Sequence, residues 1–76
     1  MKNTLLTIIK SIVDSPDDVA IEETDENGFV VFAVHVAKED MGKVIGKEGK
    51  VIRAIRNIMK IPAMKEQKRI HISLSE

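Results

Sequence analysis

Two glycines three positions apart interrupt a stretch that otherwise has the character of a helix, "KVIGKEGKVIRAIR" (residues 43–56). A glycine inside a helix costs about 1 kcal/mol relative to alanine, so Gly46 and Gly49 together are enough to end one helix and start another. Glycine also permits a tight turn and removes the Cβ that keeps another backbone at a distance. The sequence therefore predicts two helices joined by the turn Gly46-Lys47-Glu48-Gly49.

Length and composition limit the class of protein. The 76 residues fit one domain, residues 1–76, near the lower size at which an apolar core holds without a metal or disulfide. The absence of cysteine excludes a disulfide framework and a thiolate zinc site. No segment is long enough to span a bilayer, and the apolar N-terminal run is interrupted by Lys10 and lacks a cleavage site. We expect a cytoplasmic protein without a cofactor, metal or membrane contact.

Hydrophobic periodicity predicts the remaining elements. Asn3 is a suitable N-cap for the first helix, and Pro62 is expected to end or kink the last one. Three strands and three helices predict an α+β fold with order α-β-β-α-α-β, a three-stranded sheet with the helices packed on one face. In chain order, we expect a helix over 4–13, strands over 19–24 and 29–36 around a turn at 25–28, a short helix over 38–45, a longer helix from about Lys50, and a strand over 70–75.

The second strand is apolar on both of its faces. Phe32, Val34 and Val36 serve one face, and Phe29, Val31 and Ala33 serve the other. A strand with two apolar faces is covered by a neighbouring element, lies in the centre of the sheet, or presents a surface to a second copy or another protein. The sequence leaves these alternatives open.

Charge is unevenly distributed along a chain with no net charge. Residues 1–28 carry a net charge of −5, whereas residues 38–60 carry +4. On the longer helix one face is apolar, while the cations fall within an arc of about 120° on the other side. This pattern favours a surface that attracts polyanions, although ordinary solvated helix charges also explain it. The apolar face comprises Val51, Ala54, Ile55, Ile58 and Ile61, and the cations are Lys50, Arg53, Arg56 and Lys60.

The glycine turn suits an anion. The N–H groups that open the second helix point outward, where they and the helix dipole favour negative charge. Lys47 is the nearest cation, flanked by Lys43, Lys50 and Arg53, and we expect Glu48 to point away from a ligand. A plain helix–turn–helix connection without a ligand is the alternative. A nucleotide-binding P-loop does not fit, because three residues stand where that motif needs four.

The segment "MGKVIGKEGKVIRAI" resembles the I-G-x-x-G signature of KH domains, and the order of elements resembles the type II, bacterial form of that fold. The similarity runs through essentially the whole chain and is close to the small stand-alone bacterial KH proteins. The resemblance implies that Gly46, Lys47, Glu48 and Gly49 clamp single-stranded RNA. It also implies that Val44, Ile45 and Ile52 help to form an apolar groove beneath the bases.

The same resemblance implies an RNA-binding protein with broad targets and RNA-chaperone behaviour. It further implies self-association and a heteromer with a larger protein that carries its own KH domain, linked to cell elongation and division. A homodimer contact would involve Ile58, Ile61 or Met64, near Pro62, where relatives continue an alanine-rich helix. The alternative function is a protein-interaction adapter or dimerisation module on the same scaffold.

Composition and motif content argue against other functions. With two Phe, no Tyr and no Trp, base recognition has to rely on aliphatic contacts and hydrogen bonds, which fits a KH groove better than a stacking platform. The histidines, His35 and His71, lie in predicted strands beside no fixed carboxylate motif. No nucleophile has a base partner, so we expect no enzyme activity.

Overall fold

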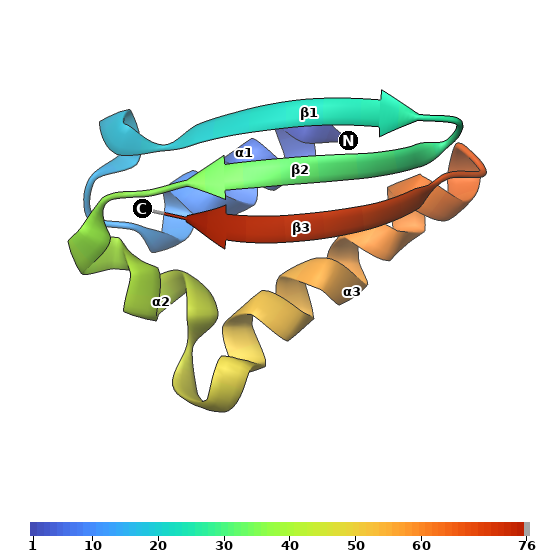
Figure 1. Cartoon of the computed structure of the whole chain (residues 1–76). Helices are drawn as coiled ribbons and strands as arrows, with labels where there is room; N and C mark the ends of the chain where they lie inside the picture. Colours follow the sequence, from blue (N-terminus) through green and yellow to red (C-terminus); the bar gives the residue numbers. More distant parts are fainter. Residues whose placement is uncertain (76) are drawn as a thin grey trace.

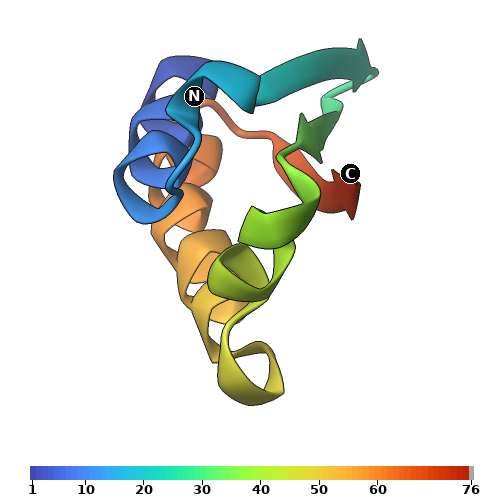
Figure 2. The same ribbon diagram turned by 90° about the vertical axis from the view of Figure 1, so that its left-hand side faces the viewer.

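The computed structural model describes residues 1–75, which form a three-stranded sheet with three helices on one of its faces (Figures 1 and 2). The predicted α+β class and the order α-β-β-α-α-β are confirmed. Single 3₁₀ turns at Pro16–Asp18, Lys38–Asp40 and Lys47–Gly49 lead into the elements that follow them. The elements are α1 (Lys2–Ile12), β1 (Ala20–Glu26), β2 (Phe29–His35), α2 (Met41–Ile45), α3 (Lys50–Lys65) and β3 (Arg69–Ser75).

The sheet has the order β1-β2-β3 and mixes two kinds of pairing. β1 and β2 run antiparallel around Asn27 and Gly28, whose φ angles of 54° and 85° suit a two-residue hairpin turn. β2 and β3 run parallel, since α2 and α3 return the chain to the end of the sheet at which β2 began. The predicted turn at 25–28 is therefore too long: Asp25 and Glu26 belong to β1, and the Asp25 carboxylate accepts the Gly28 N–H at 3.1 Å.

The core lies between the sheet and the helices. Val30, Phe32 and Val34 of β2 are fully buried, and Ile72 of β3 joins them from the next strand. The helices contribute Leu5 and Ile9 from α1, Val44 from α2, and Ile55 and Met59 from α3.

The opposite face of the sheet is open (Figure 2). β2 occupies the central position that the sequence left as one alternative, yet its outer residues Val31, Ala33 and His35 remain only partly buried. Phe29 is 46% exposed on this side. The apolar surplus of β2 is thus not covered by any element of residues 1–75.

The first helix starts earlier than expected. It begins at Lys2, with Met1 as its N-cap, because the Met1 carbonyl already accepts the Leu5 N–H at 3.1 Å. Asn3 is therefore inside the helix and is not its N-cap, and its backbone carbonyl accepts a hydrogen bond from the Thr7 hydroxyl.

The last helix runs further than expected and packs a different stripe of residues. Pro62 does not end α3, which continues to Lys65. Its buried residues, Ile55, Met59 and Ala63, follow each other at intervals of four and face the sheet. Ile58 and Ile61, predicted to share the packed face, are 48% and 61% exposed. The apolar residues of α3 cover a wider arc of the helix than the part that contacts the sheet. Only the side with Ile55, Met59 and Ala63 is therefore buried.

Candidate nucleic-acid interface

The Gly46–Gly49 loop lies at the end of the molecule farthest from the sheet, between α2 and α3 (Figure 1). Gly46 adopts φ 76° and ψ 172°, a conformation open essentially to glycine alone. A Cβ on Gly46 would also lie only 2.8 Å from the backbone nitrogen of Val51. Gly49 has a left-handed φ of 74°, but a Cβ there would only touch Ile52 Cγ2 at 4.0 Å, an ordinary van der Waals contact. The first glycine is therefore required by packing as well as by conformation.

The two residues between the glycines are exposed. The backbone of Glu48 adopts the left-handed helical conformation, with φ 57° and ψ 25°, which is uncommon for a residue with a side chain. Its carbonyl accepts a hydrogen bond from the Arg53 guanidinium at 2.8 Å, so Arg53 fastens the loop to the first turns of α3. No side chain caps the N-terminus of α3, and its first N–H groups remain directed at the loop.

The flanking cations differ in their surroundings. Lys43 forms an ion pair with Asp14, and this hydrogen bond raises the pKa of the Lys43 ammonium. Lys47 and Lys50 are exposed and have no ion pair within residues 1–75. Of the three lysines beside the loop, two are thus available to an anion, and the third is already paired with a carboxylate.

The predicted apolar groove residues are also unequal. Ile45 is 38% exposed and Ile52 is partly buried, so both present apolar surface next to the loop. Val44 has no exposed surface and belongs to the core. Ile45 and Ile52 therefore offer apolar surface beside the loop, whereas Val44 is part of the core and offers none.

Asp40 supports this region, although the sequence suggested no role for it. Its side chain is buried, and its two carboxylate oxygens accept the backbone N–H groups of Asp14 and Ser15 at 3.1 and 3.0 Å. These bonds tie the link after α1 to the start of α2. An acid directly before a short apolar helix is the only signal in the sequence that could have drawn attention to Asp40.

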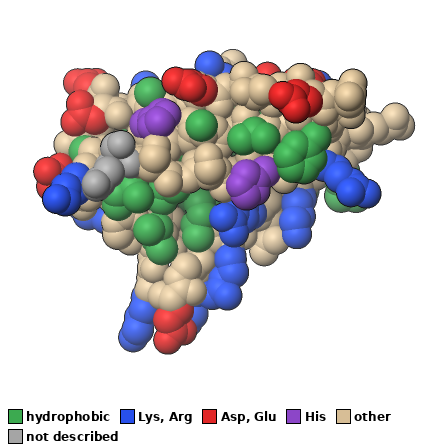
Figure 3. Space-filling view, in the orientation of Figure 1, with side chains coloured by type: hydrophobic (Ala, Val, Ile, Leu, Met, Phe, Trp, Pro, Cys, Tyr) green, Lys and Arg blue, Asp and Glu red, His purple; other side chains and the backbone are tan. Residues whose placement is uncertain are grey.

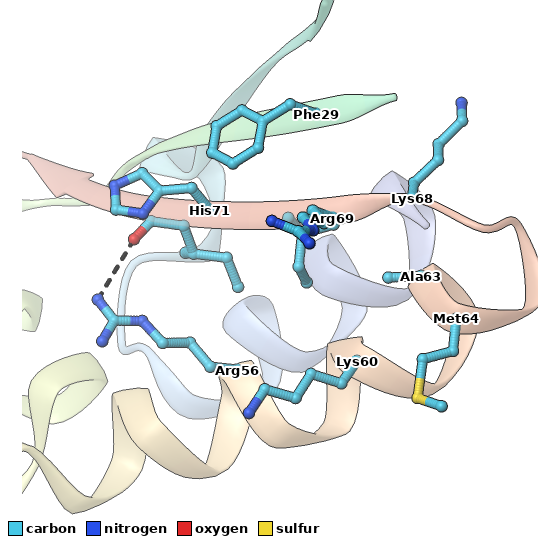
Figure 4. Close-up of a pocket in the computed structure, with 10 residues that line it drawn as sticks. Phe29, Arg56, Lys60, Ala63, Met64, Lys68, Arg69 and His71 are labelled. Carbon is cyan, nitrogen blue, oxygen red and sulfur yellow. Dashed lines mark hydrogen bonds between the residues drawn. The ribbon is translucent and has the colours of Figure 1, made fainter. Parts of the chain in front are cut away.

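The cations of α3 continue beyond the loop toward the sheet. Arg56 donates a long hydrogen bond of 3.4 Å to the Ile72 carbonyl of β3, and Lys60 lies one turn further on (Figure 4). Lys and Arg side chains accompany the exposed side of α3 from the loop to the end of the sheet (Figure 3). The predicted basic stripe therefore connects the loop with the outer edge of β3.

Other kinds of site find no support in residues 1–75. No group of three or more His, Cys, Asp or Glu side chains in this range is arranged to hold a metal ion. His35 shares a hydrogen bond of 2.6 Å with the Ser75 hydroxyl, and His71 is exposed on β3. None of the helices in this part of the chain has the length and apolar character needed to cross a membrane.

The fold and the loop together define a class of protein. Two helices joined by a G-x-x-G loop and laid on a sheet in the order α-β-β-α-α-β make a type II KH domain, as the sequence predicted. Residues 2–74 match the family model described as "KhpA/KhpB, KH domain". The chain belongs to this family, which is defined by an RNA-binding domain and not by an enzyme activity.

Similar proteins span nearly the same length. The "RNA-binding protein KhpA" of Clostridium acetobutylicum is 46% identical over 74 residues, covering 97% of this chain and 99% of that protein. The protein of the same name from Caldanaerobacter subterraneus subsp. tengcongensis is 42% identical with the same coverage. The Listeria monocytogenes protein of that name is 41% identical, and the alignment covers both chains completely.

Proposed function

We propose that this protein binds single-stranded RNA and holds its backbone at the loop Gly46-Lys47-Glu48-Gly49. The observation that carries the proposal is the exposed glycine loop at the uncapped N-terminus of α3, where N–H groups, the helix dipole and Lys47 all favour a phosphate. The names of the relatives support RNA as the ligand.

Each residue near the loop has a distinct part in this proposal. Gly46 gives the loop its conformation against Val51, Gly49 lets the phosphodiester backbone approach, and Lys47 and Lys50 contribute positive charge. Arg53 fixes the loop through the Glu48 carbonyl, and Ile45 and Ile52 provide apolar surface for the bases. The Glu48 carboxylate is directed away from the bound strand, and Lys43 contributes less because Asp14 engages it.

The ligand range follows from the same features. A backbone clamp with aliphatic side chains discriminates weakly between bases, so we propose broad RNA targets and an RNA-chaperone role in the cytoplasm, carried out by residues 1–76 as one KH domain. Because few cations are free, one domain binds weakly and gains affinity when two copies act on one strand.

Binding of a fluorescently labelled single-stranded RNA at two salt concentrations tests this proposal. We expect the native protein to bind this RNA with an affinity that falls as salt rises. The variant Lys47→Asp plus Glu48→Asp keeps both glycines and is expected not to bind it. Lys10→Asp on α1 removes the same amount of positive charge away from the loop and is the matched control. Equal binding by the loop variant and the native protein, with both folded, would contradict the clamp.

A second function is favoured by a separate surface on α3. Ile58, Ile61 and Met64 are 48%, 61% and 75% exposed and lie on one side of the helix. We propose that this patch pairs with a second copy or with a larger KH protein, in an adapter role linked to cell elongation and division. The family model covers both KhpA and KhpB, which supports a second KH protein as the partner.

Sedimentation equilibrium of the native protein and Ile61→Glu tests the adapter role. We expect the native protein to associate as its concentration rises and the variant to remain monomeric. RNA affinity for a short strand should be the same in both, because Ile61 is remote from the loop in the sequence of α3.

A further inference from the structure

The outer face of the sheet, opposite the three helices, is not covered by any element of residues 1–75 (Figure 2). Alternate residues of each strand point to this face, and the strand registers arrange them in four rows that cross the sheet. From the hairpin end, the rows are Glu26, Phe29 and Arg69; Thr24, Val31 and His71; Glu22, Ala33 and Ser73; and Ala20, His35 and Ser75.

These rows give the face three bands of different character. β1 contributes the exposed carboxylates of Glu22 and Glu26, whereas β3 contributes the exposed Arg69, and none of the three has an ion pair within the described residues. Between them, β2 contributes Phe29, which is 46% exposed, and Val31, which is partly buried. Figure 3 shows acidic side chains along the upper edge of this face, with hydrophobic side chains below them. The face is therefore acidic at one edge, apolar in the centre and basic at the other edge.

The bands limit what can cover this face. A polyanion or an anionic membrane surface would meet the carboxylates of β1, and a cationic ligand would meet Arg69. Pairing of another strand with the edge of β1 is also disfavoured, because four of the seven residues of this edge strand are acidic. The face therefore suits a protein surface that carries the same three bands in reverse order.

A second copy of the chain presents its bands in that order. When two identical sheets are stacked face to face about a two-fold axis that runs along β2, β1 of each copy lies over β3 of the other. Each row then meets the same row of the other copy, so Glu26 lies over Arg69, and Phe29 lies over Phe29. A two-fold axis across the strands would instead place β1 over β1, with carboxylates over carboxylates. The distribution of charge thus favours the first arrangement.

The size of the face sets the strength of such a contact. Three strands of seven residues make a face of roughly 15 Å by 23 Å, or about 700 Å² counted on both copies. Stable interfaces bury about 1,200 Å² or more, so this contact is weak on its own. It is therefore not populated at the low protein concentrations that suffice for a stronger contact through α3.

We propose that the open sheet face is an interface with a second copy of this chain, in which β2 packs along β2 and Glu26 of each copy pairs with Arg69 of the other. The inference is independent of the glycine loop and of the exposed patch on α3, which belongs to a helix on the opposite side of the sheet (Figure 2). A chain that uses both surfaces contacts two neighbours. Assembly then proceeds beyond a dimer at high concentration, or where several copies gather on one RNA strand.

Self-association through this face is measured without RNA in the Ile61→Glu background, which removes the α3 contact. Sedimentation equilibrium and amide NMR spectra are recorded between about 0.05 and 1 mM protein, the range in which a weak interface becomes populated. We expect the amide shifts of Val31 and Ala33 to change with concentration, and those of Gly46 and Gly49 to stay constant. Circular dichroism establishes that every variant is folded.

Charge reversal tests the pairing between the two copies. Glu26→Lys places two cations opposite each other, and Arg69→Glu places two carboxylates opposite each other, so each variant should associate about 10-fold more weakly or less. In an equal mixture of the two variants, both contacts of the mixed pair again join opposite charges. The mixture should therefore associate as strongly as the parent protein, although neither variant does so alone.

Matched controls separate this pairing from the effect of net charge. Glu23→Lys changes the charge of β1 on its other side, because Glu23 is in register with the buried Phe32. Lys10→Glu makes the opposite change on α1. These two variants have the same net charges as the face variants, so their mixture reports the general attraction between oppositely charged chains. We expect that mixture to associate no more strongly than the parent protein.

The outcomes decide the inference separately from the proposed function. Recovery of association in the mixture of Glu26→Lys and Arg69→Glu, beyond that in the control mixture, supports the interface. Absence of association by the parent protein up to about 1 mM, or an equal gain in the control mixture, would overturn it. It is also overturned if the face variants change RNA affinity while association stays constant, because the face then contacts RNA. A failure of the loop to bind RNA leaves each of these readouts unchanged.

Discussion

Gly46 lies so close to Val51 that a Cβ on this glycine would be 2.8 Å from the Val51 backbone nitrogen. Real Cβ atoms are not found this close to a backbone atom, so either the loop or the start of α3 must move if Gly46 is replaced. Gly49, with a similar positive φ, has no such neighbour. The two glycines of the loop therefore tolerate substitution to different degrees.

We expect Gly46→Ala to destabilise the protein by about 3 kcal/mol or more, because conformational strain and a backbone clash add. Gly49→Ala should cost only about 1–2 kcal/mol, the strain of a left-handed alanine. Urea unfolding of both variants measures the difference. Equal losses would mean that the packing of Gly46 against Val51 is not what requires glycine there.

Glu48 should be replaceable with a gain in stability. Its φ of 57° is left-handed, and asparagine accepts this conformation more readily than glutamate does. We expect Glu48→Asn to stabilise the fold by about 0.5–1 kcal/mol, a rise in Tm of a few degrees for a chain of this size. Lys47→Asn, at the neighbouring position without a positive φ, is the control and should give no gain.

Asp40 is expected to be essential for stability. Asp40→Ala leaves the backbone N–H groups of Asp14 and Ser15 without their acceptor and should cost about 2–4 kcal/mol. Asp40→Asn keeps one carbonyl oxygen and should lose less. Chemical denaturation compares the two, and an alanine variant as stable as the asparagine variant would show that the two hydrogen bonds contribute little.

Asp14 is expected to restrain RNA binding. Its carboxylate pairs with Lys43, next to the loop, so Asp14→Asn should free that ammonium and raise RNA affinity about 2- to 5-fold at low salt. The salt dependence should become steeper at the same time. Asp17→Asn removes an equal charge from the exposed 3₁₀ turn after α1 and should have a smaller effect.

The ion pair between Asp25 and Lys68 predicts a stability that depends on pH. The Lys68 hydrogen bond lowers the pKa of the Asp25 carboxyl, and the Asp25 hydrogen bond raises the pKa of the Lys68 ammonium. A lowered carboxyl pKa stabilises the fold above the unfolded value of about 4, and that stabilisation is lost as the pH falls through the folded pKa. A raised ammonium pKa stabilises the fold below about 10.4 and is lost as the pH rises through the folded pKa.

Asp25→Asn should therefore lower Tm at neutral pH, and the difference from the native protein should vanish in acid. The shift should be at most a few degrees, since both side chains are partly exposed and water screens the pair. Thermal unfolding between pH 3 and pH 7 measures it. A difference that persists undiminished at pH 3 would show that the ion pair is not its cause.

The sequence predicted the fold well because its signals are local. Apolar periodicity located the helices and strands to within a few residues, and Gly46 and Gly49 marked the junction between α2 and α3. The errors also have local causes. Asn3 is a good N-cap by type, but Met1 already supplies the first helical carbonyl. Pro62 favours a helix end, yet α3 continues because Ala63 is buried against the core.

The candidate site was only partly predictable. The loop residues and the cations of α3 are close together in the sequence, so spacing was enough to group them. Asp40 accepts the backbone N–H groups of Asp14 and Ser15, which lie 26 and 25 residues earlier in the chain, so only the folded protein brings these groups together. The pairing of Lys43 with Asp14 was likewise invisible, because 29 residues separate the two.

By itself, the sequence determined the order of elements, the glycine loop and the basic stripe of α3, since helix periodicity and the conformational freedom of glycine act over a few residues. The tertiary structure decided which apolar residues are buried, which cations form ion pairs, and which residues lie next to each other on neighbouring strands. Those properties depend on how distant segments pack together, as with Val44, which is fully buried, and Ile61, which is 61% exposed.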